Sequence, residues 1–312
     1  MPKISVLVIT FNQQDLIGRA LESILIQNEY VHEIIICDDC STDKNWQVIL
    51  DYTNKYPDLI KPFRNEHNLG IFENIEKCWG LPTGDINYFI DGDDVAGEGW
   101  FKTVVEYIQD NNIDYKNELF CIYGDYKCIY PNGDSFIFRN NAIKKKFNPL
   151  KLYERGMISN RSSCYSTKVL TKFNKVSQGR SYIAENAQDA QLHLFVENTY
   201  YLPFVGNIYY SGIGVSAQMD EDVLKEHEQT MVYAFEYFNR LGVRIDKYDL
   251  ALPEYNIAVK RMRQHKSLKS IFSVIKCYFK CFDPKVRFQD IQIKKSIFAV
   301  IRRFPHSKAL HW

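Results

Sequence analysis

The chemistry that this sequence could perform is concentrated in short acidic segments, of which Asp91-Gly92-Asp93-Asp94 is the densest. Carboxylates so close together repel one another unless a cation neutralises them, so the segment predicts a site for a hard divalent ion. Mg²⁺ or Mn²⁺ would bind through one or two carboxylates and complete its shell with phosphate oxygens and water. Asp and Gly are also common in solvated turns, and the segment alone leaves that alternative open.

Two further polar groups each follow an apolar run of the chain. A carboxylate at such a place can accept a hydrogen bond from the N3–H of uracil or thymine, and an aromatic side chain beside it can stack on the base. The same acidic residues could instead form a turn or cap a helix. We expect these residues to form one pocket for a nucleobase: Thr10, Phe11, Asn12, Asp38 and Asp39.

Short β-branched runs precede these polar groups and are typical of strands buried on both faces of a parallel sheet. Segments with apolar residues at helical spacing separate the runs, and Asn12 is expected to cap the first of these helices. Alternating strands and helices specify an α/β fold with a mostly parallel, Rossmann-like sheet flanked by helices. Ligands bind such sheets beyond the carboxyl ends of the strands. The expected strands are 4–9, 34–37, 60–63 and 86–90.

The pattern changes after residue 115. A turn signal at Pro131-Asn132-Gly133 lies between apolar runs at 119–126 and 136–138, which predicts a hairpin. A helix is expected at about 187–196 and a short strand near 208–210. Beyond about residue 220 the sequence predicts helices, which are expected at 223–241, 254–265, 268–282 and 288–304.

Charge is distributed unevenly along the 312 residues, although the net charge is only +1. From Tyr255 to Trp312 there are 14 Lys or Arg and two acids, which leaves the rest of the chain strongly acidic. Basic amphipathic helices of this kind can lie on an anionic bilayer, and packing of their apolar residues on the rest of the protein is the alternative. We do not expect nucleic acid as a partner, because no recognised binding motif accompanies the charge.

The eight cysteines are expected to be reduced structural residues. Cys37 and Cys40 have CxxC spacing, but no second pair or His cluster completes a zinc site. The chain shows neither a signal peptide nor a run of 18 apolar residues, so we expect a cytoplasmic protein whose basic tail contacts the inner face of the membrane.

Four segments resemble, in order and at normal spacing, the signature stretches of family 2 glycosyltransferases: 5–12 (SVLVITFN), 33–43 (EIIICDDCSTD), 65–70 (NEHNLG) and 83–94 (TGDINYFIDGDD). The resemblance implies a GT-A fold and inverting transfer from a nucleotide sugar with Mn²⁺ or Mg²⁺. It places the nucleoside at Thr10, Phe11, Asn12 and Asp39, the ribose and phosphate at Asp91 and Asp93, and the metal on Asp93 or Asp94. Residues 1–218 would then be the catalytic domain (1–115 nucleotide-binding, 116–218 acceptor-side) and 219–312 a basic helical region.

The general base is expected at Asp189. The resemblance would place an acidic pair here, but Gln188 replaces the first acid, and Glu185 is the reserve candidate. A carboxylate must lie within hydrogen-bond reach of the acceptor hydroxyl to remove its proton. An acid that complements a helix dipole is the alternative reading of Asp189. Ser211 stands where the resemblance would place Arg or His after a tyrosine.

The resemblance also suggests the substrates. The donor would be a UDP-sugar, although thymidine presents the same N3–H, and the acceptor a glycan or polyprenyl-linked glycan of a surface polysaccharide. One rival is a catalytically silent nucleotide-sugar or membrane-binding module, which Gln188 makes conceivable. The other is a nucleotidyltransferase, against which the absence of a Gly-rich, basic phosphate loop after Thr10 argues.

Overall fold

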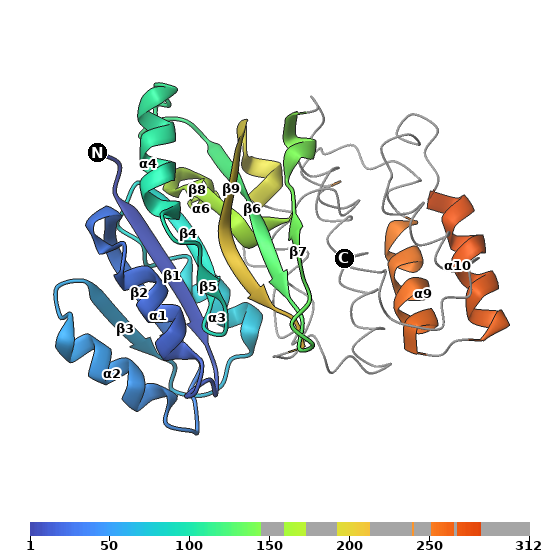
Figure 1. Cartoon of the computed structure of the whole chain (residues 1–312), viewed down its shortest axis with the longest axis horizontal. Helices are drawn as coiled ribbons and strands as arrows, with labels where there is room; N and C mark the ends of the chain where they lie inside the picture. Colours follow the sequence, from blue (N-terminus) through green and yellow to red (C-terminus); the bar gives the residue numbers. More distant parts are fainter. Residues whose placement is uncertain (145–158, 173–191, 213–238, 240–250, 265–266, 282–312) are drawn as a thin grey trace. The chain divides into compact units, whose positions relative to one another are not determined.

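The computed structural model describes residues 1–144, 159–172, 192–212, 239, 251–264 and 267–281 (Figure 1). The chain divides into two compact units, one of residues 1–149 and 158–218 and the other of residues 150–157 and 219–312. Each unit is described by itself below. The functions expected for residues 1–115, 116–218 and 219–312 remain predictions.

The first half of the sheet is parallel and follows the predicted strand and helix order. Its strands are β1 (Ile4–Thr10), β2 (Val31–Asp38), β3 (Ile60–Arg64) and β4 (Ile86–Asp91), and they lie in the order β3-β2-β1-β4. The connections contain α1 (Ile17–Leu25), the short η1 (Asn28–Tyr30), α2 (Asn45–Lys55) and α3 (Ile71–Cys78) (Figure 1). The four strands predicted from apolar runs are therefore confirmed.

The second half of the sheet mixes parallel and antiparallel pairs. Here β8 (Ser163–Ser166) joins β4 to β6 (Phe120–Ile129), and β9 (Asn198–Tyr210) lies between β6 and the two-residue β5 (Val95–Ala96). The predicted hairpin is confirmed, because β7 (Ser135–Phe138) pairs antiparallel with β6. The prediction of a strand only at 208–210 was too short, since β9 has 13 residues.

Two helices and two short 3₁₀ turns accompany this half of the sheet. The helix α4 (Trp100–Asp110) follows β5, and α6 (Thr167–Leu170) follows β8. Two short 3₁₀ turns, η2 (Asn141–Lys144) and η3 (Asn160–Ser162), lie against β9, and η3 also lies against β4 and β6. Strand β8 and turn η3 carry no extended apolar pattern, and the sequence did not predict them.

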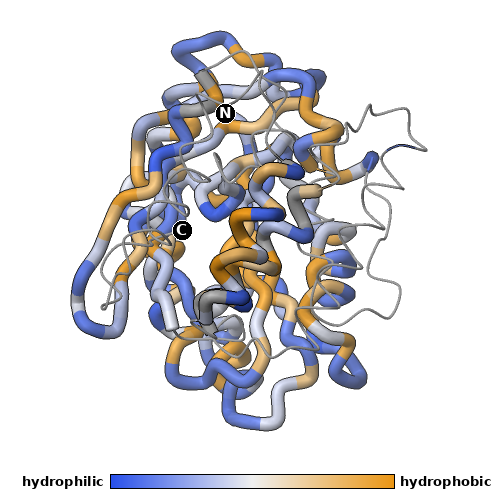
Figure 2. The backbone as a smooth tube through the Cα atoms, turned by 90° about the vertical axis from the view of Figure 1, so that its right-hand side faces the viewer, coloured by the Kyte–Doolittle hydropathy of each residue, from blue (hydrophilic) through white to orange (hydrophobic). Residues whose placement is uncertain are grey.

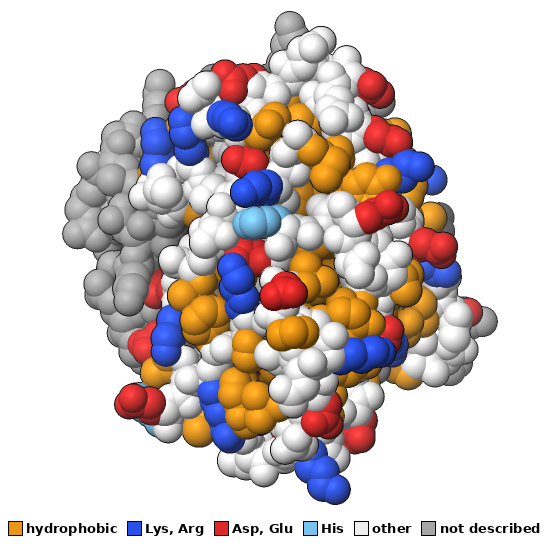
Figure 3. All heavy atoms as spheres, turned by 90° about the vertical axis from the view of Figure 1, so that its left-hand side faces the viewer, with side chains coloured by type: hydrophobic (Ala, Val, Ile, Leu, Met, Phe, Trp, Pro, Cys, Tyr) orange, Lys and Arg blue, Asp and Glu red, His pale blue; other side chains and the backbone are white. Residues whose placement is uncertain are grey.

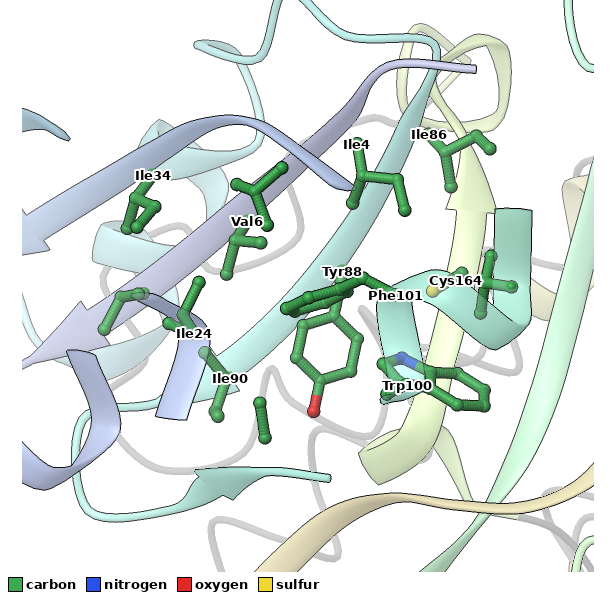
Figure 4. Packing of buried hydrophobic residues seen from close by; sticks show 14 of the residues in the cluster. Ile4, Val6, Ile24, Ile34, Ile86, Tyr88, Ile90, Trp100, Phe101 and Cys164 are labelled. Atoms are coloured by element: carbon green, nitrogen blue, oxygen red, sulfur yellow. The ribbon is translucent and has the colours of Figure 1, made fainter. Parts of the chain in front are cut away.

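The core lies between one face of the sheet and the helices α1, α2 and α4. Side chains from alternate strand positions, such as Ile4, Val6 and Val8, are fully buried there. Tyr88 packs edge-on against Phe101, with ring centroids 5.3 Å apart, and Figure 4 shows it among side chains of β1, β2 and α4. Each such side chain contributes roughly 1.5–3 kcal/mol through burial, and together they hold the sheet rigid.

The expectation that Asn12 caps the first helix is wrong. Helix α1 begins only at Ile17, and the residue before it, Leu16, makes no capping hydrogen bond with its side chain. Asn12 instead has φ 53°, a left-handed conformation that Asn tolerates better than most residues. Its side chain Oδ1 accepts a hydrogen bond from the Thr42 backbone N–H at 2.8 Å. Asn12 therefore links the loops that follow β1 and β2.

A buried carboxylate, Glu33, joins the strands at the amino-terminal edge of the sheet. Its Oε1 accepts hydrogen bonds from Ser5 Oγ at 2.6 Å and from the backbone N–H of Thr83 at 2.6 Å. Its Oε2 is paired with Lys61 Nζ at 2.5 Å. Burial alone would raise the pKa of Glu33, but the hydrogen bonds from Lys61, Ser5 and Thr83 outweigh burial and lower the pKa from 4.5 to about 2.

We expect Glu33→Gln to lower the free energy of unfolding by about 2 to 4 kcal/mol, because it removes a charge that buried donors and Lys61 require. Since the folded pKa lies below the unfolded one, Glu33 contributes its full stability above about pH 5 and loses it as pH falls toward 2. Urea unfolding of wild type and variant at several pH values measures this. The control Glu106→Gln removes an exposed ion pair with Lys102 and should change stability by less than about 0.5 kcal/mol. Equal stability of wild type and Glu33→Gln at pH 7 would contradict the prediction.

The described part of the second unit is a pair of antiparallel helices, α9 (Leu252–Gln264) and α10 (Leu268–Cys281). Val274 and Cys277 of α10 pack against Tyr255 and Val259 of α9. Lys280 Nζ pairs with Glu254 at 2.7 Å, which joins the end of α10 to the start of α9. Both helices contain hydrophobic as well as hydrophilic residues (Figure 2), as expected for helices with one packed face. The predicted helices at 254–265 and 268–282 are confirmed, whereas those at 223–241 and 288–304 lie outside the described residues.

Figure 3 shows the face of the first unit that carries α2 and β3. On this face, Lys and Arg side chains are interspersed with Asp and Glu.

In the described portion of the chain, we find no helix long and apolar enough to cross a membrane.

Candidate functional site

The sheet register brings the predicted polar groups to one edge. Thr10 at the end of β1 lies beside Asp38 at the end of β2, and Asp91 at the end of β4 lies beside Ile9. Asp38 in turn lies beside Arg64 at the end of β3. Because the strands are parallel, their carboxyl ends form a single ligand-binding edge.

The loop after β1 presents the aromatic residue that was expected to stack on a base. Phe11 is 42% exposed, whereas Thr10 is buried and its hydroxyl lies 2.8 Å from Gln13 Oε1. The backbone N–H of Asn12 donates to Ser41 Oγ at 2.9 Å. The loops after β1 and β2 are thus fixed to one another, and Phe11 projects from them into solvent.

Asp38 and Asp39 have different surroundings although both are buried. Asp38 accepts hydrogen bonds from Ser41 and Asn45 and is paired with Arg64 Nε at 3.4 Å. These contacts stabilise the turn after β2, so the turn-forming interpretation suits Asp38.

The Asp39 carboxylate holds the loop that follows β3. It accepts hydrogen bonds from the Asn65 side chain at 2.8 Å, the Leu69 backbone at 2.8 Å and the Gly70 backbone at 2.9 Å. A carboxylate has roughly four acceptor positions, so these bonds leave about one for a ligand. Asp39 is 2% exposed, so its carboxylate is almost completely shielded from solvent.

The acidic segment forms a tight turn at the end of β4. The Asp94 backbone N–H donates to Asp91 O at 3.0 Å, and the Gly92 backbone N–H donates to Ile9 O at 2.8 Å. A Cβ at position 92 would press against the side chains of Gln13 and Thr10, so any other residue here would require those side chains to shift. Glycine therefore holds the carboxylates next to the end of β1.

Asp94 is the most deeply buried acid of this turn, with a side chain 3% exposed, whereas the Asp91 side chain is 45% exposed. Burial raises the pKa of Asp94; Arg161 opposes this rise, and the neighbouring Asp91 and Asp93 add to it. Burial and Asp91 likewise raise the pKa of Asp93. When Asp91, Asp93 and Asp94 are all ionised, the positive charge around them is therefore too small to balance their negative charge.

These residues fit a divalent cation. Asp94 Oδ1 is buried and has no hydrogen-bond partner among the described residues, so it is an acceptor suited to a metal. The same described ranges contain no cluster of three His, Cys, Asp or Glu residues ready to hold an ion. Mg²⁺ and Mn²⁺ do not need one, because they commonly take one or two carboxylates together with substrate phosphates.

Two arginines that the sequence did not single out lie at this turn. Arg161 Nη1 lies 3.5 Å from Asp94 Oδ2 and 3.9 Å from Asp91 Oδ2. Arg19 Nη2 donates to the backbone oxygen of Asp93 at 2.6 Å. Arg161 precedes the unpredicted strand β8, which places it beside β4, so no local pattern in the sequence indicated its position.

The structure does not describe the residues expected to supply the general base. Asp189, Glu185 and Gln188 lie outside the described residues, so the structure does not locate the expected base. His193, which follows them, is buried and stacks on Tyr123 with ring centroids 5.7 Å apart. It has the contacts of a core residue.

The fold matches solved structures over nearly the whole chain. A crystal structure of Staphylococcus aureus TarS (residues 1–349) in complex with UDP-GlcNAc superposes with a TM-score of 0.64 at 16% identity, covering 96% of this chain and 89% of that chain. The mannosyltransferase PcManGT of Pyrobaculum calidifontis, in complex with GDP-Man and Mn²⁺, matches with a TM-score of 0.50 at 12% identity, covering 97% of this chain and 86% of the other. The fold is that of the GT-A glycosyltransferases, as the sequence predicted.

Sequence comparisons show which family the chain resembles. Residues 5–158 match the family model "Glycosyl transferase family 2", so this segment of the chain is similar to the catalytic domains of that family. A putative glycosyltransferase of Bacillus subtilis, EpsE, is 35% identical over 95 residues, which cover 30% of this chain and 34% of EpsE. The Campylobacter jejuni GalNAc(5)-diNAcBac-PP-undecaprenol beta-1,3-glucosyltransferase is 25% identical over 299 residues, covering 92% of this chain and 90% of that enzyme. The alignment thus spans only about a third of EpsE but nearly all of the Campylobacter enzyme.

Proposed function

We propose that this protein transfers a sugar from a UDP-sugar to a hydroxyl group of a glycan or polyprenyl-linked glycan, with inversion at the anomeric carbon and with Mg²⁺ or Mn²⁺. The observation that carries the proposal is the turn at the end of β4, where the buried and unpartnered Asp94 Oδ1 lies at the ligand-binding edge of a GT-A fold. Release of the nucleoside diphosphate from a panel of donors tests it.

Each strand end has a separate role in this proposal. Phe11 stacks on the base, Asp39 accepts its N3–H, and Thr10 and Asn12 shape the pocket. Asp91 and Asp93 face the ribose and phosphates, and Asp93 or Asp94 holds the metal. When bound, the ion offsets the negative charge that develops on the departing diphosphate.

Asp189 is proposed as the general base. It takes the proton of the acceptor hydroxyl, whose oxygen attacks the anomeric carbon on the side opposite the nucleotide. A single displacement inverts the configuration, and positive charge on the sugar ring builds up as the bond to the nucleotide breaks. Rigid strand ends supply the positioned charges that stabilise this state.

The relatives support the choice of donor and acceptor. TarS has been crystallised with UDP-GlcNAc, which supports a uridine nucleotide for this chain. The Campylobacter enzyme is named for an undecaprenol-linked glycan acceptor, and it aligns with this chain over nearly its full length. A polyprenyl-linked acceptor would also bring the protein to the inner face of the cytoplasmic membrane.

Helix α10 presents a surface suited to such a membrane. Lys269, Phe272, Lys276 and Phe279 are spaced three or four residues apart, so they form one stripe of the helix. Phe272 and Phe279 are 68% and 71% exposed, although α10 packs on α9 through other residues. We propose that this stripe rests on anionic lipid, with the phenylalanines inserted and the lysines at the phosphates.

We expect the double variant Phe272→Ser and Phe279→Ser to reduce binding to vesicles of phosphatidylglycerol and phosphatidylcholine about tenfold or more, since each phenylalanine contributes up to roughly 1.5–3 kcal/mol when buried. Co-sedimentation measures this binding. The control Ile26→Ser removes an equally exposed hydrophobic residue of the first unit, 67% exposed, and should leave binding unchanged. Equal binding of the double variant and wild type would refute the lipid contact.

A further inference from the structure

Two consecutive tyrosines at the end of β9 are each covered by an arginine. The Arg161 guanidinium lies 3.7 Å from the centre of the Tyr209 ring, and that of Arg19 lies 3.9 Å from the centre of the Tyr210 ring. Consecutive residues of a strand point to opposite faces, so the arginines approach β9 from opposite sides. Each pair gains from the attraction between a cation and an aromatic face.

Both arginines also contact the acidic turn, but they contact different atoms. Arg19 donates to the backbone oxygen of Asp93, which fixes the turn without touching a carboxylate. Arg161 faces the carboxylates of Asp91 and Asp94 at 3.9 and 3.5 Å. Arg161 is therefore the arginine whose charge lies where the proposed metal and diphosphate would bind.

The backbone around Arg161 is fixed by buried hydrogen bonds. Its N–H donates to Ser159 Oγ at 3.3 Å, and the Ser159 N–H donates to Asn140 Oδ1 at 2.8 Å. Asn140 is fully buried, and its side-chain nitrogen donates to Gly124 O of β6 at 2.6 Å. This chain of contacts anchors the Arg161 backbone to the central sheet, while its side chain remains 29% exposed.

We infer that Arg161 binds the diphosphate of the donor; this inference rests on the function proposed above. The carboxylates of the turn outnumber the two guanidinium groups, and a divalent ion among them makes the cluster net positive. A diphosphate is the anion that this charge favours, and a guanidinium can donate to two of its oxygens at once. A divalent ion bound to Asp94 would also weaken the electrostatic attraction between that carboxylate and Arg161. The guanidinium could then donate hydrogen bonds to the phosphate.

A purely structural ion pair is the competing interpretation of Arg161. The Arg161 side chain is 29% exposed and lies 3.5 and 3.9 Å from two carboxylates of the acidic turn, so part of the guanidinium is open to a ligand anion. The chain offers a matched control in Arg139, which is paired with the buried Asp125 at 3.3 Å on the β6–β7 hairpin.

The test is isothermal titration calorimetry of the full-length protein, which measures its affinity for UDP, dTDP, GDP and inorganic pyrophosphate, each in the presence of Mg²⁺. We expect Arg161→Ala to bind the preferred nucleoside diphosphate and pyrophosphate about 10- to 100-fold more weakly than wild type, because a hydrogen bond to a charged group contributes roughly 1.5–3 kcal/mol. Arg139→Gln should bind both as wild type does. Circular dichroism checks folding, and Arg161→Gln replaces the alanine variant if that variant is unfolded.

Wild-type affinity in the folded Arg161 variant would overturn the role of Arg161 and leave the proposed function standing. If the wild-type protein binds neither a nucleoside diphosphate nor pyrophosphate, both the role of Arg161 and the proposed function are wrong. A loss in Arg161→Ala that Arg139→Gln shares would also overturn the inference, since it would show a general effect of removing an ion pair.

Discussion

Asp94→Ala is expected to reduce sugar transfer by about a thousandfold or more, because it removes a charge that stabilises the departing diphosphate. The Asp94 side chain is 3% exposed, and its Oδ1 has no hydrogen-bond partner among the described residues, so the variant loses the most deeply buried acceptor of the acidic turn. Release of nucleoside diphosphate in the presence of acceptor measures the effect. Chelation of divalent metal should reduce the wild-type rate to a similar extent.

Asp51→Asn is the control for removing an acid from this unit. Asp51 is exposed on α2 and accepts a hydrogen bond only from Gln47 among the contacts we observe, so its loss should leave the rate unchanged. If Asp94→Ala keeps more than about a tenth of the wild-type rate, Asp94 does not hold the catalytic ion, and Asp93 becomes the candidate.

Asp189→Ala has the second-largest expected effect, a loss of transfer of about 10²- to 10⁴-fold with unchanged affinity for the donor. A general base acts only on the acceptor, so the rate and the donor affinity separate a catalytic role from a structural one. Transfer to acceptors in a membrane extract gives the rate, and titration with the nucleoside diphosphate gives the affinity.

Glu185→Ala distinguishes the two candidates for the base. If Asp189 is the base, Glu185→Ala retains most of its activity. If instead the loss occurs in Glu185→Ala and Asp189→Ala is active, the reserve candidate is the base. A loss of donor affinity in Asp189→Ala would indicate a structural role at the start of a helix.

The parallel half of the fold could be predicted because its strands are buried on both faces. The runs 4–9 and 34–37 are typical of such strands, and the parallel order of β1, β2 and β4 puts Asp39 and Asp91 at the same edge of the sheet. The GT-A fold followed from the same segments through resemblance.

The rest of the sheet could not be predicted because its strands are short or long-range. β8 has four residues and β5 has two, and both are held in place by partners distant in sequence. Arg161 reaches Asp94 only because β8 pairs with β4, so nothing local to position 161 indicated a site. Asn12 was misassigned because a residue that favours helix caps also tolerates the left-handed conformation that this loop requires.

The central claim is most directly tested by measuring release of nucleoside diphosphate from UDP-, dTDP- and GDP-sugars, with Mg²⁺ or Mn²⁺ and with membrane extract as the source of acceptor. The account predicts metal-dependent release from a UDP-sugar that is lost in Asp94→Ala. If no donor binds or reacts under these conditions, the protein is not a glycosyltransferase, and a catalytically silent binding module takes its place.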